Sequence, residues 1–282
     1  MLHLAQNQDY PPALYIVSTP IGNLADITVR ALYVLSIVDY IACEDTRHTG
    51  LLLQNYAIKA KTISCHEHNQ KQMSQTILNY LQQGLRIAYV SDAGTPAISD
   101  PGSILVDTVL KAKFKVIPIS GISTPTALMS VAGQITQDNS SNYCFAGFLP
   151  TSNKAKLDYL EKLANYRIPI IFFESPKRIE QTLKDLKIHF NNRKIVIARE
   201  LTKRFEEIIY ANINEDIKIN PKGEFCILIH GDDTKESNPQ LAVKLLKELI
   251  PQIGTKQSSK IVANCLDMPQ KLIYNLALEL NI

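Results

Sequence analysis

The sequence predicts an α/β protein, because short apolar runs alternate along it with segments that have the helical spacing of apolar residues. The run at 87–90 shows this most clearly, since it is rich in β-forming residues and too short for a stable helix. A loop of Ser, Asp, Gly, Thr and Pro follows it at 91–102. In an open parallel sheet, ligands bind beyond the carboxyl ends of the strands, so this loop is a candidate binding surface.

The other elements repeat this pattern. Apolar runs that each end in a polar loop are predicted strands: residues 14–17, 40–43, 87–90, 116–119, 168–173 and 195–198. Helical patterns lie between most of them, at residues 28–35, 70–81, 103–110, 125–132 and 156–163. The last predicted strand is 225–229. Because strands and helices alternate, we expect largely parallel sheets.

The length of 282 residues suggests about two domains. A break near 120–125 divides the predicted elements into an N-terminal α/β domain, residues 1–121, and a second α/β domain, residues 122–236. The polar stretch 231–239 resembles a linker. It leads into a predicted helical tail, residues 237–282.

Three short helices are expected in this tail, at 241–250, 258–266 and 269–280. Pro251 should stop the first helix, and a serine should cap the second. Such an arrangement resembles a helix-turn-helix module, whose Lys256, Lys260 and Lys271 would suit phosphate contacts. A helical tail packed on the main body is an equal alternative.

Composition excludes several classes of protein. With 45% hydrophobic and 20% charged residues there is material for two buried cores, and a net charge of +3 excludes a polybasic nucleic-acid coat. An RNA substrate stays possible if basic side chains cluster. Five cysteines without a C-x-x-C spacing argue against a disulfide framework or zinc ribbon and favour the reducing cytosol. No apolar run approaches the ~20 residues that span a bilayer, and no secretory signal is apparent, so we expect a soluble cytoplasmic protein without a membrane partner.

Two nucleotide fingerprints are missing from the sequence. There is no G-x-G-x-x-G after the first predicted strand and no G-x-x-x-x-G-K-[ST] anywhere, so a dinucleotide or triphosphate ligand loses support. The loops combine Gly and Pro, which let the backbone approach a ligand closely, with Ser and Thr hydroxyls. These groups suit an adenosine and a cationic sulfonium better than a pyrophosphate.

Several strings carry a resemblance to a known family: L-Y-I-V-S-T-P-I-G-N-L-A-D-I-T (14–28), E-D-T-R-H-T-G-L-L (44–52), V-S-D-A-G-T-P-A-I-S-D-P-G (90–102), F-A-G-F-L-P (145–150), A-R-E-L-T-K (198–203) and K-G-E (222–224). In this order they resemble the 16S ribosomal RNA 2'-O-ribose methyltransferases of the tetrapyrrole-methylase superfamily. The resemblance implies two α/β domains of tetrapyrrole-methylase type with S-adenosyl-L-methionine in the cleft between them, often as a homodimer. It implies that the methyl acceptor is the ribose 2'-hydroxyl of a decoding-centre cytidine in 16S rRNA of the small ribosomal subunit.

The resemblance also implies which residues contact the cofactor: Pro20, Asp92, Gly94, Thr95, Ile98, Ser123, Thr124, Phe173, Leu201 and Glu224. Asp92 is open to a second interpretation, because an aspartate in such a loop commonly caps its own backbone turn. At Ser120-Gly121-Ile122 the chain departs from the Pro-Gly-Pro that is common among relatives, and Gly121 is retained.

Candidate catalytic residues gather after two predicted strands. Glu44, Asp45, Arg47 and His48 would be expensive to bury unless paired, so they form either a surface ion cluster or part of a cleft, and the resemblance favours the cleft. A ribose hydroxyl is a weak nucleophile, so a base or a cation should help. Candidate bases are Asp45, His48 and Glu200, and candidate cations are Arg47 and Lys203. The choice among them stays open, and a purely positional mechanism is also viable.

No metal site is expected, because His66 and His68 have no evident third and fourth ligand. Two alternatives to the rRNA methyltransferase remain. One is a methyltransferase that acts on a tetrapyrrole or another small molecule. The helical tail and the string at 44–52 argue against this alternative. The other is a non-catalytic RNA-binding ribosome-assembly factor. The intact Gly94-Thr95-Pro96 argues against this alternative, because a protein without activity would not need to keep the binding loop.

Overall fold

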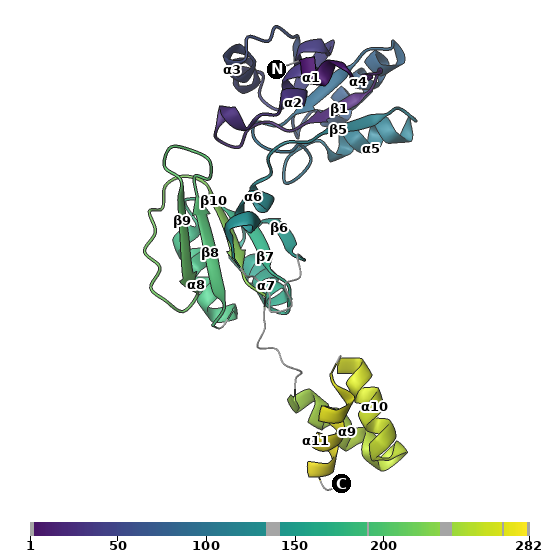
Figure 1. Cartoon of the computed structure of the whole chain (residues 1–282), viewed down its shortest axis with the longest axis vertical. Helices are drawn as coiled ribbons and strands as arrows, with labels where there is room; N and C mark the ends of the chain where they lie inside the picture. The colour runs from purple at the N-terminus through teal and green to yellow at the C-terminus, as the bar shows by residue number, and fades with distance from the viewer. Residues whose placement is uncertain (1–2, 134–141, 191, 232–238, 267, 281–282) are drawn as a thin grey trace.

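The computed structural model describes residues 3–133, 142–190, 192–231, 239–266 and 268–280. Two five-stranded sheets, each covered by helices, follow one another along the chain, and a unit of three helices follows the second sheet (Figure 1). The predicted α/β class, with two α/β units and a helical tail, is therefore confirmed. The predicted boundary at 236/237 and most of the predicted linker lie outside the described residues, and the division at 121/122 stays a prediction.

The first sheet is parallel throughout and has the order β3-β2-β4-β1-β5. Its strands are β1 (Leu14–Val17), β2 (Tyr40–Cys43), β3 (Thr62–Ser64), β4 (Ile87–Val90) and β5 (Val116–Ile119). The helices of this unit are α1 (His3–Gln6), α2 (Val29–Ile37), α3 (Thr46–Asn55), α4 (Gln70–Gln82) and α5 (Ser103–Lys111), with a 3-10 turn at Leu24–Asp26. A helical crossover joins each strand to the next one along the chain, from β1 to β5, which is what parallel pairing requires.

Both faces of the first sheet are buried. Ala88 and Val90 of β4 pack in the cluster that contains residues of α2 and α3, and Ile87 and Tyr89 pack in the cluster that contains residues of α4 and α5. This alternation explains why β4 is a continuous apolar run. The chain leaves β1 toward β2 on one side and leaves β4 toward β5 on the other. The two neighbouring loops therefore separate, and such a switch point is where open α/β sheets bind ligands.

The second sheet has the order β6-β7-β10-β8-β9. Its strands are β6 (Cys144–Phe148), β7 (Ile170–Glu174), β8 (Lys194–Arg199), β9 (Glu207–Asn212) and β10 (Phe225–Ile229). Residues of α7 (Asn153–Ala164) and α8 (Ile179–His189) join the core cluster on one face, and residues of α6 (Thr124–Val131) join the cluster on the other.

The expectation of largely parallel sheets is wrong for this second sheet. β6 and β7 are parallel, but β10 is antiparallel to both β7 and β8, and β8 is antiparallel to β9. The reason is that the chain reverses direction in the short segment 200–206, so that β9 runs back along β8. Residues 213–224, which contain no helix, then carry the chain across β8 to β10, and β10 runs in the same direction as β9. β7 and β8 still point the same way, and their carboxyl ends share one edge with the start of β10.

The helical unit consists of α9 (Pro239–Ile253), α10 (Thr255–Leu266) and α11 (Gln270–Glu279), which enclose a small core of their own that includes Leu246, Val262 and Ile273. The prediction that Pro251 stops the first helix is wrong, because Pro251 lies inside the last turn of α9. The helix ends instead at Gly254, whose left-handed backbone (φ +76°) lets its N–H donate to the carbonyl of Ile250 at 3.0 Å.

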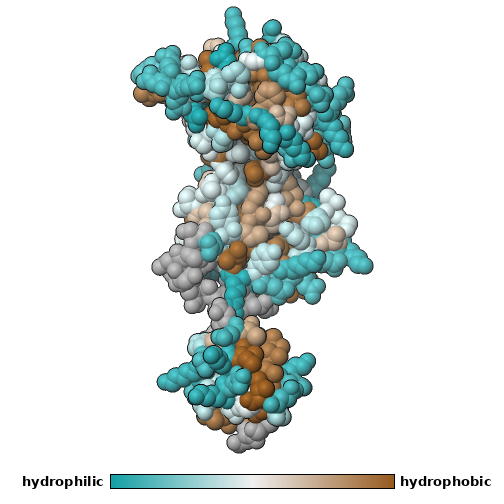
Figure 2. All heavy atoms as spheres, turned by 90° about the vertical axis from the view of Figure 1, so that its right-hand side faces the viewer, coloured by the Kyte–Doolittle hydropathy of each residue, from teal (hydrophilic) through white to brown (hydrophobic). Residues whose placement is uncertain are grey.

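The predicted serine cap of the second tail helix is also wrong. α10 begins at Thr255, so Ser258 lies inside the helix, where its buried hydroxyl donates to the carbonyl of Gly254. Figure 2 shows an apolar area on one face of this helical unit. The large apolar side chains that are exposed in the unit are Leu241, Ile253, Ile261, Leu272, Tyr274 and Leu278. In the described part of the chain, no helix is long and apolar enough to cross a membrane.

Candidate functional site

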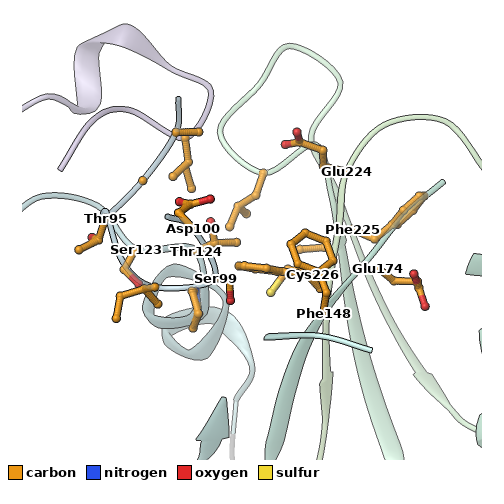
Figure 3. A pocket seen from close by; sticks show the side chains of 18 of the residues that line it. Thr95, Ser99, Asp100, Ser123, Thr124, Phe148, Glu174, Glu224, Phe225 and Cys226 are labelled. Atoms are coloured by element: carbon orange, nitrogen blue, oxygen red, sulfur yellow. The ribbon is translucent and has the colours of Figure 1, made fainter. Parts of the chain in front are cut away.

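A cavity of about 380 Å³ lies between the two α/β units (Figure 3). One wall comes from the loop after β4 and the start of α6, and the other comes from the carboxyl ends of β7 and β8 and the start of β10. The lining residues are Ile21, Ala93, Gly94, Thr95, Ile98, Ser99, Asp100, Ser123, Thr124, Pro125, Phe148, Phe173, Glu174, Ser175, Pro176, Ala198, Leu201, Glu224, Phe225 and Cys226. The cavity thus lies at the switch point of the first sheet.

The loop after β4 is anchored to the loop after β1. Thr19 and Gly94 exchange two backbone hydrogen bonds, at 2.9 Å from the N–H of Thr19 and 3.1 Å from the N–H of Gly94. Beside them, the hydroxyls of Ser18 and Thr95 lie 2.9 Å apart. These bonds hold the backbone of Gly94 and Thr95 at the cavity wall.

This loop has an unusual backbone. Gly94 (φ +79°) and Gly102 (φ +133°) adopt positive φ, as glycine readily does, but Ala97 (φ +67°) and Ser99 (φ +63°) adopt it as well. Non-glycine residues in this region are uncommon and cluster at functional sites. The strained residues therefore mark the same loop that lines the cavity.

The opposite wall contacts the first unit closely at two points. A Cβ atom built at Gly22 would lie 2.4 Å from Cγ of Lys203 and 2.8 Å from Oγ1 of Thr202. A Cβ atom at Gly147, in the bulge of β6, would lie 3.0 Å from Oγ of Ser99. These glycines let the loops of the two units approach each other around the cavity.

An ion network borders the second wall. Nζ of Lys203 lies 3.0 Å from Oε1 of Glu200 and 2.8 Å from Oε2 of Glu224, and the N–H of Glu224 donates to Glu200. That N–H and the Lys203 ammonium lower the pKa of Glu200. Desolvation lowers the pKa of Lys203, but the two carboxylates raise it by more, so the net change is upward.

A second charged group lies at the start of α3. Asp45 caps this helix by accepting from the N–H of Arg47 at 2.8 Å, and it also accepts two hydrogen bonds from the Arg47 guanidinium, at 3.1 and 2.7 Å. These bonds hold the pKa of Asp45 well below its usual range. The Arg47 side chain is 89% exposed, and Nδ1 of His48 lies 3.8 Å from Oδ2 of Asp92.

Three carboxyl groups lie near one another at the carboxyl end of the first sheet. Burial first, and then the charges of Glu44 and Asp92, raise the pKa of Asp100 to about 6, while a hydrogen bond with Ser91 acts in the opposite direction. Burial and the charge of Asp92 likewise raise the pKa of Glu44. Of these three residues, Asp100 is the one that lines the cavity.

Most residues predicted to contact the cofactor line the cavity: Gly94, Thr95, Ile98, Ser123, Thr124, Phe173, Leu201 and Glu224. Pro20 and Asp92 do not line it, but their neighbours Ile21 and Ala93 do. None of the predicted catalytic residues lines it: Asp45, Arg47, His48, Glu200 and Lys203. Lys203 and Glu200 reach the lining residue Glu224 through the ion network. The roles of these residues stay predictions.

Sequence reasoning missed several lining residues, among them Ser99, Asp100 and Phe148. All three lie in strings that carry the resemblance to the family. The sequence therefore indicates that these segments belong to the site, but it does not indicate which side chains face the cavity. At Ser120-Gly121-Ile122 the backbone of Gly121 lies close to the side chain of Ser18, because a Cβ at Gly121 would lie 2.7 Å from Cβ of Ser18. Among the described residues, no group of three or more His, Cys, Asp or Glu side chains is placed to hold a metal ion.

Comparison with known proteins adds relatives that match the chain almost end to end. Ribosomal RNA small subunit methyltransferase I of Pasteurella multocida is 42% identical over 94% of this chain and 96% of the relative. The proteins of the same name from Vibrio cholerae and Synechocystis are 42% and 41% identical, over 95% of this chain and 95% and 98% of theirs.

Solved structures share the fold at lower identity. The methyltransferase CobJ has a TM-score of 0.59 at 15% identity and covers 78% of this chain and 94% of its own. The cobalt precorrin-4 methyltransferase CbiF has a TM-score of 0.56 at 20% identity, over 78% of this chain and 95% of its own. The family model described as Tetrapyrrole (Corrin/Porphyrin) Methylases matches residues 13–215. The chain therefore belongs to the tetrapyrrole methylase family, within the branch of the ribosomal RNA small subunit methyltransferase I proteins.

Proposed function

We propose that this protein transfers a methyl group from S-adenosyl-L-methionine to the ribose 2'-hydroxyl of a decoding-centre cytidine in the 16S rRNA of the small ribosomal subunit. The observation that carries the proposal is the match over about 95% of the chain to relatives named as rRNA small subunit methyltransferases. The matched region includes the helical unit, which a comparison restricted to the methylase domains would not reach.

The cavity fits this cofactor in size and chemistry. Its volume of about 380 Å³ lies within the range of about 300–1,000 Å³ that small-molecule sites occupy. Backbone at Gly94 and Thr95 and the hydroxyls of Ser123 and Thr124 would hold the polar groups. The apolar side chains of Phe173 and Leu201 would cover the adenosine. When bound, the cofactor supplies an electrophilic methyl group on a sulfonium centre.

The residues of the chain contribute alignment and exclusion of water. Holding the acceptor hydroxyl in line with the methyl group converts a bimolecular reaction into an effectively unimolecular one. The close approach of Gly22 to the 200–203 loop limits access of water from that side. Tight anchoring of Gly94 by Thr19 keeps the first wall in place while the acceptor enters.

The charged groups beside the cavity are proposed to handle the RNA. Arg47 keeps donors exposed although it is paired with Asp45, and such an arginine suits a phosphate group. The Lys203 ammonium and the His48 ring would add further hydrogen-bonding groups for the RNA. Because the Asp45 and Glu200 oxygens already accept strong hydrogen bonds, their proposed role is to orient Arg47 and Lys203.

The proposed partners are the small ribosomal subunit and, as the resemblance implies, a second copy of the chain. We assign the helical unit to RNA affinity, through Lys256, Lys260 and Lys271. Static light scattering of the purified protein tests the homodimer, since a monomeric mass at micromolar concentration would contradict it.

The function itself is tested by transfer of tritiated methyl groups. The full chain would be incubated with labelled S-adenosylmethionine and assembled small subunits, free 16S rRNA, or a tetrapyrrole. Nucleoside mass spectrometry of the labelled RNA then identifies the modified nucleoside, and reverse transcription at low nucleotide concentration locates it. We expect 2'-O-methylcytidine at one decoding-centre position.

Each other result has a clear meaning. Label in the tetrapyrrole alone would move the assignment to a small-molecule methyltransferase. RNA binding without transfer to any acceptor would identify a non-catalytic ribosome-assembly factor. A methyl group on a base rather than a ribose would retain rRNA methylation and overturn the 2'-O assignment.

A further inference from the structure

The cavity contains acidic side chains that differ in how many partners they have. Glu174 is buried, accepts hydrogen bonds from the N–H of Ser175 and the hydroxyl of Thr182, and forms an ion pair with Arg178, each at 2.7 Å. Glu224 is paired with Lys203. Asp100 also lines the cavity (Figure 3), and in the described part of the chain no cation lies within ion-pair distance of it. Among these three acidic side chains, Asp100 is therefore the one whose carboxylate is not held in an ion pair.

The candidate bases outside the cavity are poorly suited to accept a proton. Asp45 accepts three hydrogen bonds from Arg47, and Glu200 accepts from Lys203 and from the N–H of Glu224. These bonds lower the pKa of both carboxyl groups. Neither residue lines the cavity, and His48, the third candidate base, does not line it either. None of the three is therefore placed to reach an acceptor that enters the cavity.

The surroundings of Asp100 favour proton uptake. The titratable groups around it are Glu44 from the end of β2, Asp92 from the end of β4, and Tyr89 within β4, while the paired Glu224 lies on the opposite wall. Burial and the two nearby carboxyl groups raise the pKa of Asp100 to about 6. Such a group is ionised at neutral pH and is still basic enough to take a proton.

We propose that Asp100 is the proton acceptor for the ribose hydroxyl that is methylated, an inference that rests on the proposed function. The ribose oxygen forms a bond to the methyl carbon, while the carbon–sulfur bond breaks and its electron pair goes to sulfur. The hydroxyl proton goes to the Asp100 carboxylate, which releases it to water after the product leaves. Asp100 is thus a catalytic residue, whereas Glu44 acts through it, because the charge of Glu44 raises the pKa of Asp100.

The test compares three variants with the unaltered protein. Asp100→Asn keeps the shape and removes the base. Glu44→Gln removes a neighbouring charge and should lower the pKa of Asp100. Asp107→Asn is the matched control, because Asp107 lies in an exposed pair with Lys111 on α5, away from the cavity. Three quantities would be measured: single-turnover methyl transfer to small subunits as a function of pH, cofactor affinity by calorimetry, and the carboxyl titration of Asp100 by carbon-13 NMR.

We expect the transfer rate of the unaltered protein to rise with pH through about 6, because the ionised carboxylate is the active form. Asp100→Asn should lower the rate at least ~100-fold and flatten this rise, with cofactor affinity changed less than about twofold. Glu44→Gln should move both the rise in rate and the NMR titration to lower pH. Asp107→Asn should match the unaltered protein.

The failures of the inference and of the function differ. If the unaltered protein methylates rRNA and Asp100→Asn does so equally well at every pH, the inference is overturned and the function stands. Loss of cofactor affinity in Asp100→Asn would also overturn it, by making Asp100 a cofactor ligand. An NMR titration near the ordinary aspartate value would do the same without any assay of activity. If the unaltered protein transfers no methyl group to rRNA, the function fails and the inference fails with it.

Discussion

Replacing Asp100 by asparagine should make the folded protein more stable at neutral pH, although it should impair transfer. The pKa of Asp100 rises from 3.8 to about 6 on folding, so the folded state resists its ionisation. At ~1.4 kcal/mol for each pKa unit, the ionised group destabilises the fold by about 3 kcal/mol at most. Because the side chain keeps some contact with solvent, about 1–3 kcal/mol is a realistic range.

The effect has a defined dependence on pH. The destabilisation is fully present above the folded pKa of about 6 and disappears as pH falls toward the unfolded value of 3.8, because the folded state takes up the proton first. The stability gain of Asp100→Asn should therefore be largest near pH 8 and about half as large near pH 5.

Urea unfolding followed by circular dichroism measures this difference, and tyrosine fluorescence serves as a second probe because the chain has no tryptophan. Since the protein contains more than one unit, the transition that reports the first sheet must be separated from the others. Asp107→Asn, an exposed surface change, should show no such gain. Equal or lower stability of Asp100→Asn near pH 8, or a gain that does not shrink toward pH 5, would refute the reasoning.

Three further predictions concern the walls of the cavity and the tail. Gly94→Val should abolish measurable cofactor binding by calorimetry, whereas Gly84→Val, which has the same left-handed strain far from the cavity, should cost about 1–2 kcal/mol of stability and leave binding intact. Gly22→Ala should weaken cofactor binding at least ~10-fold, because the new Cβ pushes back the 200–203 loop, and unchanged affinity would contradict this. Gly50→Ala is the control, because its new Cβ meets no atom within 4 Å. Removing residues 237–282 should weaken RNA binding and reduce its salt dependence without changing cofactor affinity, and full RNA affinity of the truncated chain would make the tail structural.

Most of the strands predicted from the sequence are largely buried, and β5, which was also predicted, is the partly exposed exception. β4 and β10 are continuous apolar runs because helices cover both sides of each, and such runs stand out in any sequence. Three strands were not predicted from the sequence. β3 has only three residues, all partly buried, and the residues of β6 and β9 are partly buried or exposed, so none of the three is a buried apolar run. The reversal between β8 and β9 uses neither glycine nor proline, so nothing in the sequence announced a hairpin in place of a crossover.

The candidate site was predicted to the level of loops but not of side chains. Asp92 and Asp100 belong to one string, and sequence reasoning chose Asp92. The left-handed residues Ala97 and Ser99 redirect the backbone between them, so that Asp100 lines the cavity while Asp92 faces His48. Positive φ at alanine and serine has no sequence signature, since these residues rarely adopt it.

The position of β10 in the middle of the second sheet determines when this sheet can form during synthesis. All strands of the first sheet lie within residues 14–119, so that unit can fold as soon as this segment has left the ribosome. The second sheet must wait for residues 225–229, and until then β7 and β8 present unpaired edges to other nascent chains. A chain cut at residue 215, where the family match ends, would keep those edges open and would be expected to aggregate.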